Sequence, residues 1–242
     1  MTAPSGPARP VPGTPQDKTR IRDAATVIVA RNPDRPQVLM GQRGAAAAFM
    51  PNKMVFPGGA IDPGDAAVPL ADGLGPICRA RLAEDAAPHI ARAAPAAAIR
   101  ELWEETGLVL GTPGAWPDAP PDWAGFAATG HRPCAAALRF VFRAITPPGR
   151  PRRFDARFFL ADAAALQGDP DDFSQACDEL SALQWVPLDR VRGFDLPFIT
   201  QVVLAEVAAL IGTEGPPDAV PFFRNDDEES LFLRLHGRPA QD

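Results

Sequence analysis

The sequence is short of cysteine, of long apolar runs and of positive charge. Its 242 residues contain three cysteines, Cys78, Cys134 and Cys177, an odd number with no close pair. This argues against a disulfide framework and against a zinc site. No run approaches the ~18 apolar residues of a membrane span, and residues 1–20 lack the apolar core of a secretory signal. We therefore expect a cytoplasmic protein without a membrane partner.

The formal net charge of −6 narrows the range of partners. Neutralising a nucleic-acid backbone needs a basic surface, so the charge argues against a general nucleic-acid binder. A small phosphorylated substrate needs only a local basic pocket, and that class stays open. Hydrophobic residues make up 46% of the chain and charged residues 22%, which is ordinary for a globular protein with a sizeable core.

Proline is abundant, with 29 residues against a usual share of about 5%. The prolines cluster in loops and tails at 4–15, 113–121, 147–151 and 216–221. Between these clusters, β-rich runs predict strands. The predicted strands cover residues 23–31, 37–43, 54–56, 138–146, 153–161 and 179–188. Residues 32–36 form the turn of a hairpin between the first two, and a glycine-rich turn is expected after the third.

Helical spacing predicts a short helix near residues 77–85 and a second helix over residues 95–106. Pro95 suits the first position of the second helix because its missing N–H costs nothing there, and Gly107 is a natural stop. A proline-rich loop is expected at 111–125. The clearest amphipathic helix covers 197–212, where one face is apolar: Ile199, Val202, Val203, Val207 and Leu210. Strands mixed with helices predict an α/β sandwich.

The second of these helices carries an unusual cluster of charge, RELWEE, at residues 100–105. On a helical projection Glu101, Glu104 and Glu105 share an arc about 100° wide, opposite the apolar residues. Glu101 and Glu105 repel each other at i,i+4, and acidic residues near a helix C-terminus oppose the helix dipole. A solvated acidic face is the ordinary interpretation. A divalent cation such as Mg²⁺ would relieve the repulsion, and helical spacing alone leaves both interpretations open.

Upstream, the stretch FPGGAIDPGD contains Gly58 and Gly59, where the backbone could approach a ligand or a metal closely. With the charged helix it resembles the box of the Nudix hydrolases, G-x5-E-x7-R-E-U-x-E-E-x-G-U, in which U is a bulky aliphatic residue. Every fixed position of the second half is matched, by Arg100, Glu101, Leu102, Glu104, Glu105, Gly107 and Leu108. Gly59 matches the first glycine, and Asp65 stands in place of the first glutamate.

The chain departs from the box in its spacing. Asp65 and Arg100 are separated by 34 residues (66–99) where the box has seven, an excess of about 27. Such an insertion costs little loop-closure entropy. A subgroup of the family, which includes peroxisomal coenzyme A diphosphatases of animals, carries a long insertion inside the box, and this chain resembles that subgroup.

The resemblance implies a Nudix-type α/β/α sandwich with a mixed β-sheet over residues 21–212, in which residues 66–94 are an insertion in the box. Residues 1–20 are expected to be a disordered, proline-rich tail. Residues 213–242 are expected to be a C-terminal extension. Within it, residues 221–230 are either a lid or an oligomer contact, and a homodimer stays open.

The resemblance also implies the chemistry: water attacks a phosphorus of a diphosphate, assisted by Mg²⁺ or Mn²⁺. The implied metal ligands are Glu101, Glu104, Glu105, the carbonyl of Gly59, and Asp65. For Asp65, the alternative to binding the metal is a supporting role. The implied catalytic residues are Glu101, Glu105 and Arg100, which orients the glutamates. The general base is not assigned to one glutamate.

Three further charged residues are considered for the substrate. Arg43 and Arg157 would each bind a substrate phosphate or form a structural ion pair. Glu179 is either a distal general base or a structural residue, and we prefer the structural role. The implied substrate is a small-molecule diphosphate, with coenzyme A or acyl-CoA first. An ADP- or NDP-sugar, a dinucleotide or an NADH-like compound is the alternative. A non-catalytic nucleotide-sensing regulator on the same fold is a further alternative.

Overall fold

The computed structural model of this chain describes residues 20–45, 47, 49–225 and 229–238. The tail expected at residues 1–20 lies outside these residues, apart from Arg20. Within the described residues no helix is long and apolar enough to cross a bilayer.

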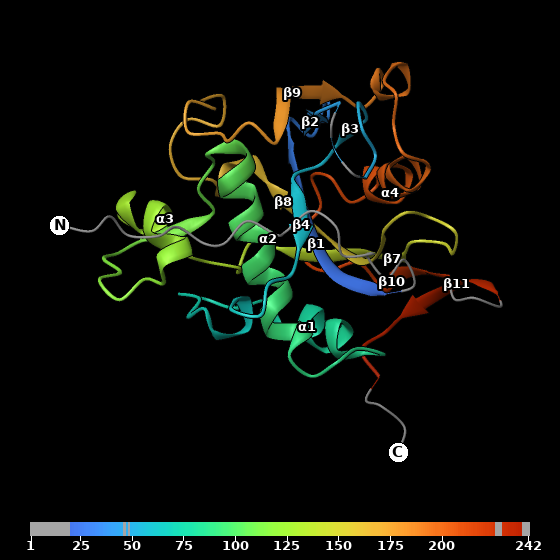
Figure 1. The fold of residues 1–242 in the computed structure, drawn as a ribbon, viewed down its shortest axis with the longest axis horizontal. Helices are drawn as coiled ribbons and strands as arrows, with labels where there is room; N and C mark the ends of the chain where they lie inside the picture. The colour runs from blue at the N-terminus through green and yellow to red at the C-terminus, as the bar shows by residue number, and fades with distance from the viewer. Residues whose placement is uncertain (1–19, 46, 48, 226–228, 239–242) are drawn as a thin grey trace, which may run out of the picture.

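One mixed β-sheet forms the centre of the molecule (Figure 1). Its strands are β1 (Ile21–Arg31), β2 (Gln37–Arg43), β3 (Met54–Val55), β4 (Gly58–Ala60), β7 (Arg139–Ile145), β8 (Arg153–Asp162), β9 (Leu180–Pro187), β10 (Val220–Asn225) and β11 (Ser230–Leu235). The order along the main path is β11-β10-β7-β8-β1-β2-β3, and β4 pairs with β1 and β9 with β2. The β1–β8 and β7–β10 pairs are parallel, and the others are antiparallel. Two further strands, β5 (Gly111–Pro113) and β6 (His131–Pro133), form a separate small ribbon.

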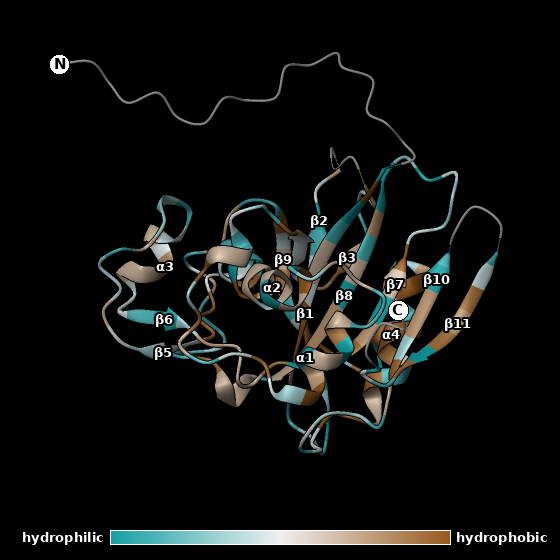
Figure 2. Ribbon diagram, turned by 90° about the horizontal axis from the view of Figure 1, so that it is seen from below, coloured by the Kyte–Doolittle hydropathy of each residue, from teal (hydrophilic) through white to brown (hydrophobic). Residues whose placement is uncertain are grey.

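The helices cover both faces of this sheet. They are α1 (Pro76–Ala83), α2 (Ile90–Thr106), α3 (Ala124–Ala128) and α4 (Phe198–Ala208), with 3₁₀ turns η1 (Asp65–Ala67), η2 (Pro121–Trp123), η3 (Ala163–Ala165) and η4 (Val191–Gly193). Figure 2 shows α2 and α4 on opposite sides of the central strands. The alternation along β1 serves both faces, because Val27 and Val29 pack with α2 whereas Ile28 packs with α4. The predicted α/β/α sandwich with a mixed sheet is therefore confirmed.

Three local predictions were wrong. The glycine-rich turn is partly a strand, β4, because Gly58 and Gly59 pair with Thr26 and Ala25 of β1. The helix predicted to begin at Pro95 begins at Ile90, with Pro95 inside it. That proline lies near the helix start, so its missing N–H removes one backbone bond. The buried apolar face of the helix outweighs that loss. The loop expected at 111–125 contains β5, η2 and the start of α3.

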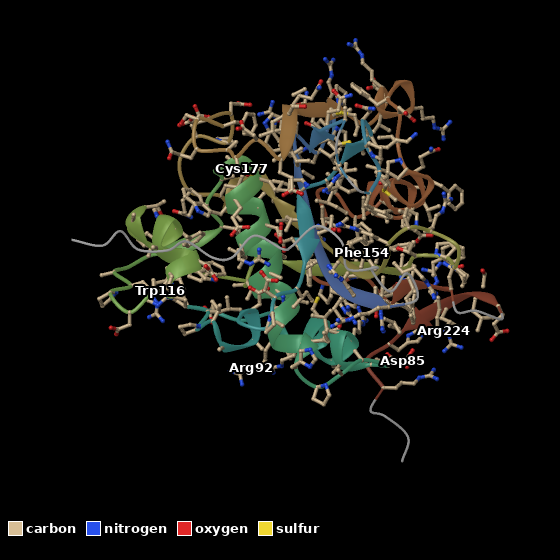
Figure 3. The ribbon with its side chains drawn as sticks, viewed as in Figure 1. Asp85, Arg92, Trp116, Phe154, Cys177 and Arg224 are labelled. Carbon is tan, nitrogen blue, oxygen red and sulfur yellow. The ribbon has the colours of Figure 1, made fainter. Side chains whose placement is uncertain are left out.

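The segments expected to be an insertion (66–94) and a C-terminal extension (from 213) lie together at one edge of the sheet. The first segment forms most of η1, all of α1 and the start of α2, and the second adds β10 and β11 to the sheet. The Glu84 carboxylate, directly after α1, accepts the backbone N–H groups of residues 236, 237 and 238 at 2.8, 2.6 and 3.2 Å. Asp85 and Arg224 face each other across the same junction at 3.9 Å (Figure 3). The two additions therefore stabilise each other.

Candidate metal-binding and catalytic site

The three glutamates lie at the C-terminal half of α2, where the helix packs against β4 (Figure 1). The helix ends at Gly107, which has φ +75° and donates its N–H to the Trp103 carbonyl at 2.8 Å. The Glu105 Oε2 atom accepts the N–H of Gly58 at 2.7 Å. A Cβ at Gly59 would lie 2.5 Å from the Glu101 carboxylate, so only glycine lets β4 come this close to α2.

Arg100 is at the centre of this cluster and is 6% exposed. Its Nε and Nη2 atoms donate to the two oxygens of Asp65, both at 3.1 Å. Its Nη1 atom donates to Glu101 at 2.8 Å and to Glu104 at 3.1 Å. Burial alone would lower the pKa of Arg100, but its hydrogen bond to Asp65 and the surrounding carboxylates outweigh this and raise the pKa. Arg100 thus contacts every carboxylate of the predicted set except Glu105.

Asp65 belongs to this cluster, although 34 residues (66–99) separate it from Arg100 in the sequence. It is 2% exposed, and its Oδ2 atom also accepts the Asp62 N–H at 2.8 Å. Both carboxylate oxygens of Asp65 therefore accept hydrogen bonds from Arg100 in a bidentate ion pair. These contacts favour the supporting role of Asp65 over the role of metal ligand.

The electrostatics of the glutamates follow from burial. Burial raises the pKa of Glu101 to about 7, with Arg100 opposing the shift and Glu104 adding to it. Burial likewise raises the pKa of Glu105 to about 8, opposed by the Gly58 N–H and increased by Glu101 and Glu179. Glu104 is more exposed, and burial raises its pKa as well. A cation in contact with these carboxylates would favour their charged forms.

The candidate metal-ligating atoms are all oxygens, which suits a hard cation. The Glu105 Oε1 atom is buried and has no hydrogen-bond partner among the described residues, an arrangement that costs free energy unless something binds there. In the part of the chain that the structure describes, however, no three acidic, histidine or cysteine side chains converge as a ready metal site. Glu101 and Glu104 are turned toward Arg100 instead. Arg100 contacts only the Oε1 atom of Glu101 and the Oε2 atom of Glu104, so the second oxygen of each carboxylate is not bound by Arg100.

Arg43 and Glu179 form an ion pair of 2.8 Å beside the glutamates. They meet because β9 runs antiparallel to β2, with Arg43 opposite Leu180. Glu179 raises the pKa of both Glu101 and Glu105, so it lies within electrostatic reach of the cluster. The ion pair with Arg43 is in keeping with the structural role preferred for Glu179, and its electrostatic effect on the cluster keeps the role of a distal base as a prediction.

Arg157 forms structural ion pairs, which was one of the two roles considered for it. It is 1% exposed and pairs with Asp155 at 3.0 Å and Asp23 at 2.8 Å. Arg143 holds the same Asp155 at 2.7 Å. A guanidinium enclosed in this way is not available to a phosphate.

Two neighbouring features complete the surroundings. Trp123 and Phe126 are buried and pack edge-on at 5.4 Å, which supports a role as loop anchors rather than as a stacking surface. Figure 3 shows Cys177 at the C-terminal end of α2, where its N–H donates to the Glu104 carbonyl at 3.0 Å.

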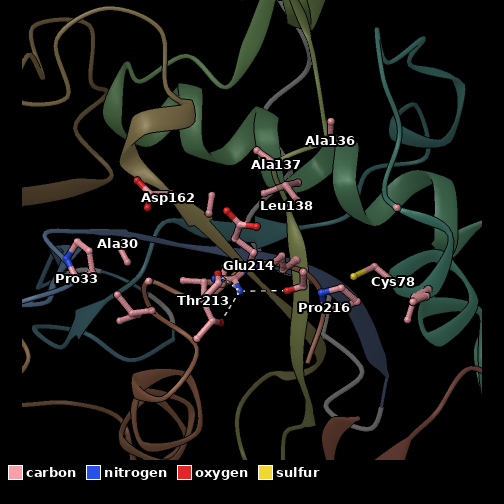
Figure 4. A pocket seen from close by; sticks show the side chains of 18 of the residues that line it. Ala30, Pro33, Cys78, Ala136, Ala137, Leu138, Asp162, Thr213, Glu214 and Pro216 are labelled. Atoms are coloured by element: carbon pink, nitrogen blue, oxygen red, sulfur yellow. Dashed lines mark hydrogen bonds between the residues drawn. The ribbon is translucent and has the colours of Figure 1, made fainter. Parts of the chain in front are cut away.

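A cavity of about 560 Å³ lies elsewhere, between the start of α1, strands β7 and β8, and the loop after α4 (Figure 4). None of its lining residues belongs to α2 or β4. Arg139 forms part of its wall and donates to the Thr213 carbonyl at 2.8 Å. This cavity is separate from the carboxylate cluster.

Comparison with known proteins places the chain in a family. A solved Nudix hydrolase from Alicyclobacillus acidocaldarius is 31% identical, over 79% of this chain and 92% of that one, with a TM-score of 0.60. The chain belongs to the Nudix hydrolase family. The Nudix assignment is shared by a Caenorhabditis elegans protein that carries the name nudix hydrolase 7, 34% identical over 178 residues. That match covers 68% of this chain, which spans about half (51%) of the length of the C. elegans protein.

A more remote similarity is to the structure of a Caenorhabditis elegans Ap4A hydrolase in a binary complex. It is 16% identical over 79% of this chain and 98% of that one, with a TM-score of 0.46. No family model matches the chain. Nudix hydrolases generally use divalent metal ions, and none of these three names specifies coenzyme A.

Proposed function

We propose that this Nudix chain is a hydrolase that depends on a divalent cation, Mg²⁺ or Mn²⁺, and cleaves the diphosphate linkage of a nucleoside diphosphate joined to another moiety. The observation that carries the proposal is the buried Glu105 Oε1 atom, which has no hydrogen-bond partner in the described part of the chain and lies on the helix that also carries Glu101 and Glu104. A buried, unsatisfied carboxylate oxygen is destabilising unless a ligand binds it.

The glutamates of α2 have two proposed roles, cation binding and proton transfer. Glu101, Glu104 and Glu105 would hold the cation, together with the Gly59 carbonyl. When bound, the cation would supply charge neutralisation on the diphosphate. Glu101 or Glu105 accepts a proton from the attacking water, whose oxygen forms a new bond to phosphorus. The bond between that phosphorus and the bridging oxygen breaks, and two phosphate-containing products leave.

Arg100 acts through the glutamates rather than on the substrate. Its guanidinium binds Glu101 and Glu104 on one side and Asp65 on the other. Arg43 is the basic residue that we assign to a substrate phosphate, because its Nη2 atom donates to the half-exposed carboxylate of Glu179 beside the cluster. A phosphate would compete with Glu179 for this guanidinium.

The proposed substrate is coenzyme A or an acyl-CoA. Support comes from the resemblance of the long box insertion to that of coenzyme A diphosphatases, and the insertion is a folded segment that packs on α2. The alternative substrate is an ADP- or NDP-sugar, a dinucleotide or an NADH-like compound, in which the same linkage is cleaved.

A panel of these compounds, incubated with the full chain and Mg²⁺ or Mn²⁺, tests both parts. Coenzyme A should yield phosphopantetheine and an adenosine bisphosphate, detected by mass spectrometry. Cleavage of only an ADP-linked compound would reject the coenzyme A assignment. Binding of nucleotides without turnover under any cation would favour the regulator and reject the enzyme.

The matched variants are Glu104→Gln and Glu214→Gln. We expect Glu104→Gln to lower turnover roughly 100-fold or more, because it removes a charged ligand while conserving shape. Glu214 is exposed in the loop after α4, so its variant should leave turnover unchanged. Equal rates in the two variants would remove Glu104 from the metal site.

A further inference from the structure

The strand β11 is an open edge of the central sheet. It pairs with β10 at six consecutive positions without a register shift, from Ser230 to Leu235. Among the described residues no strand covers its other side, and Figure 2 shows it as the outermost strand. At the other end of the main strand order lies β3, which has only two residues. A long, regular edge strand is a template for pairing with another chain.

The side chains of this edge are unusually apolar. Phe232 is 50% exposed, and its ring lies near those of Phe142 and Phe223. On the opposite face Leu233 and Leu235 pack against the core under α2. The strand has no proline, no bulge and one charged residue, Arg234. These are not the features with which monomeric proteins protect a sheet edge.

We propose that β11 is the interface of a homodimer, in which the β11 strands of two copies pair antiparallel across a two-fold axis. Facing residues in such a pair lie on the same face of the sheet. An axis at Phe232 brings the two Phe232 rings together and places Leu231 opposite Leu233. An axis at Leu233 places Phe232 opposite Arg234. Both registers match apolar with apolar or aromatic with cation.

Charge selects a second copy in antiparallel orientation as the partner. Glu229 directly precedes β11, and its carboxylate also lies 3.9 Å from Arg224. Arg234 lies near the end of the strand and Arg238 follows it. Antiparallel pairing sets each acidic beginning against the partner's basic end, whereas parallel pairing sets like charges together. The basic end is held in position because Glu84 binds the N–H groups of residues 236–238.

The proposed interface is separated from the carboxylate cluster. The strands β10, β7 and β8 lie between β11 and β1, which carries β4. Dimerisation therefore neither requires nor disturbs the proposed catalysis, and the two proposals can fail independently.

Sedimentation equilibrium of the full chain, over a range of concentrations, tests the proposal. We expect a species of about twice the 25.7 kDa chain mass. The variant Phe232→Asp should raise the dissociation constant at least tenfold. The control Ile77→Asp alters an equally exposed apolar residue on α1, 50% exposed, and should leave it unchanged. Thermal melts establish that both variants are folded. A monomer at every concentration, or a dimer unaffected by Phe232→Asp, would overturn the proposal.

Cysteine cross-linking then tests the register in a Cys177→Ser background, which removes the exposed native thiol. Facing residues of antiparallel strands are about 4.5–5.5 Å apart at Cα, a spacing that a disulfide spans. Mild oxidation should produce a covalent dimer from Phe232→Cys or from Leu233→Cys, according to the axis. A dimer that neither variant cross-links uses another surface and refutes the assignment.

Discussion

Replacement of Asp65 by asparagine separates the two roles considered for this residue. Asp65 is 2% exposed, and its two oxygens accept hydrogen bonds from Arg100 at 3.1 Å each. Asparagine keeps the shape, but it loses the charge and one acceptor. A hydrogen bond to a charged group contributes about 1.5–3 kcal/mol. Because Arg100 retains Glu101 and Glu104, we expect Asp65→Asn to cost about 2 kcal/mol and to lower the melting temperature by roughly 4–8 °C.

The matched control is Asp62→Asn. Asp62 is 65% exposed at its side chain and approaches Arg100 only to 3.7 Å, so its loss should cost about 0.5 kcal/mol or less. Urea denaturation of the two variants and the parent chain gives the free energies of unfolding. Equal stabilities of the Asp65 and Asp62 variants would refute the argument that Asp65 supports Arg100.

The dependence of turnover on Mg²⁺ concentration provides the second measurement. If Asp65 acts through Arg100, Asp65→Asn lowers kcat but changes the half-activating Mg²⁺ concentration by less than about threefold, well below the roughly 10–100-fold expected from loss of a group that holds a metal. A rise of tenfold or more with unchanged stability would instead make Asp65 a metal ligand.

Two further predictions concern the same site. Gly59→Ala places a methyl group 2.5 Å from the Glu101 carboxylate, and by displacing that carboxylate it should lower turnover at least about tenfold. The control Gly64→Ala should leave turnover unchanged, because no described atom lies within 4 Å of the added methyl group. Equal rates in the two variants would refute the close approach of Gly59 to Glu101. In the metal-free protein, the folded-state pKa values of Glu101 and Glu105 are raised from 4.5 to about 7 and about 8. Their stabilising contribution is therefore present below about pH 4.5 and is lost as pH rises through 7 to 8. The melting temperature should fall between pH 5 and pH 9, and Mg²⁺ should reduce that fall by binding the charged forms; a melting temperature that rises over this range without metal would contradict these shifts.

Local sequence predicted the parts of the fold that depend on neighbouring residues. The strands β2 and β8 and the stop of α2 at Gly107 were predicted within a residue or two. The sharing of one helix face by the carboxylates follows from 3.6 residues per turn, so it needed no structure. Strand β4 could not be predicted in this way, because a glycine pair becomes a strand only when β1 supplies its hydrogen bonds. The start of α2 at Ile90 likewise depends on burial against the sheet.

The sequence by itself determined that Glu101, Glu104 and Glu105 share one helix face, because the helical repeat is a local pattern. The resemblance to the Nudix box added Gly59 and Asp65 as candidates. Only the tertiary structure decided what each residue contacts. Asp65 lies beside Arg100 because η1, which begins at Asp65, and α1 pack against α2. Glu179 lies beside Arg43 because β9 pairs with β2. Contacts between residues far apart in the chain depend on which strands pair and which faces pack, and no local periodicity records that choice.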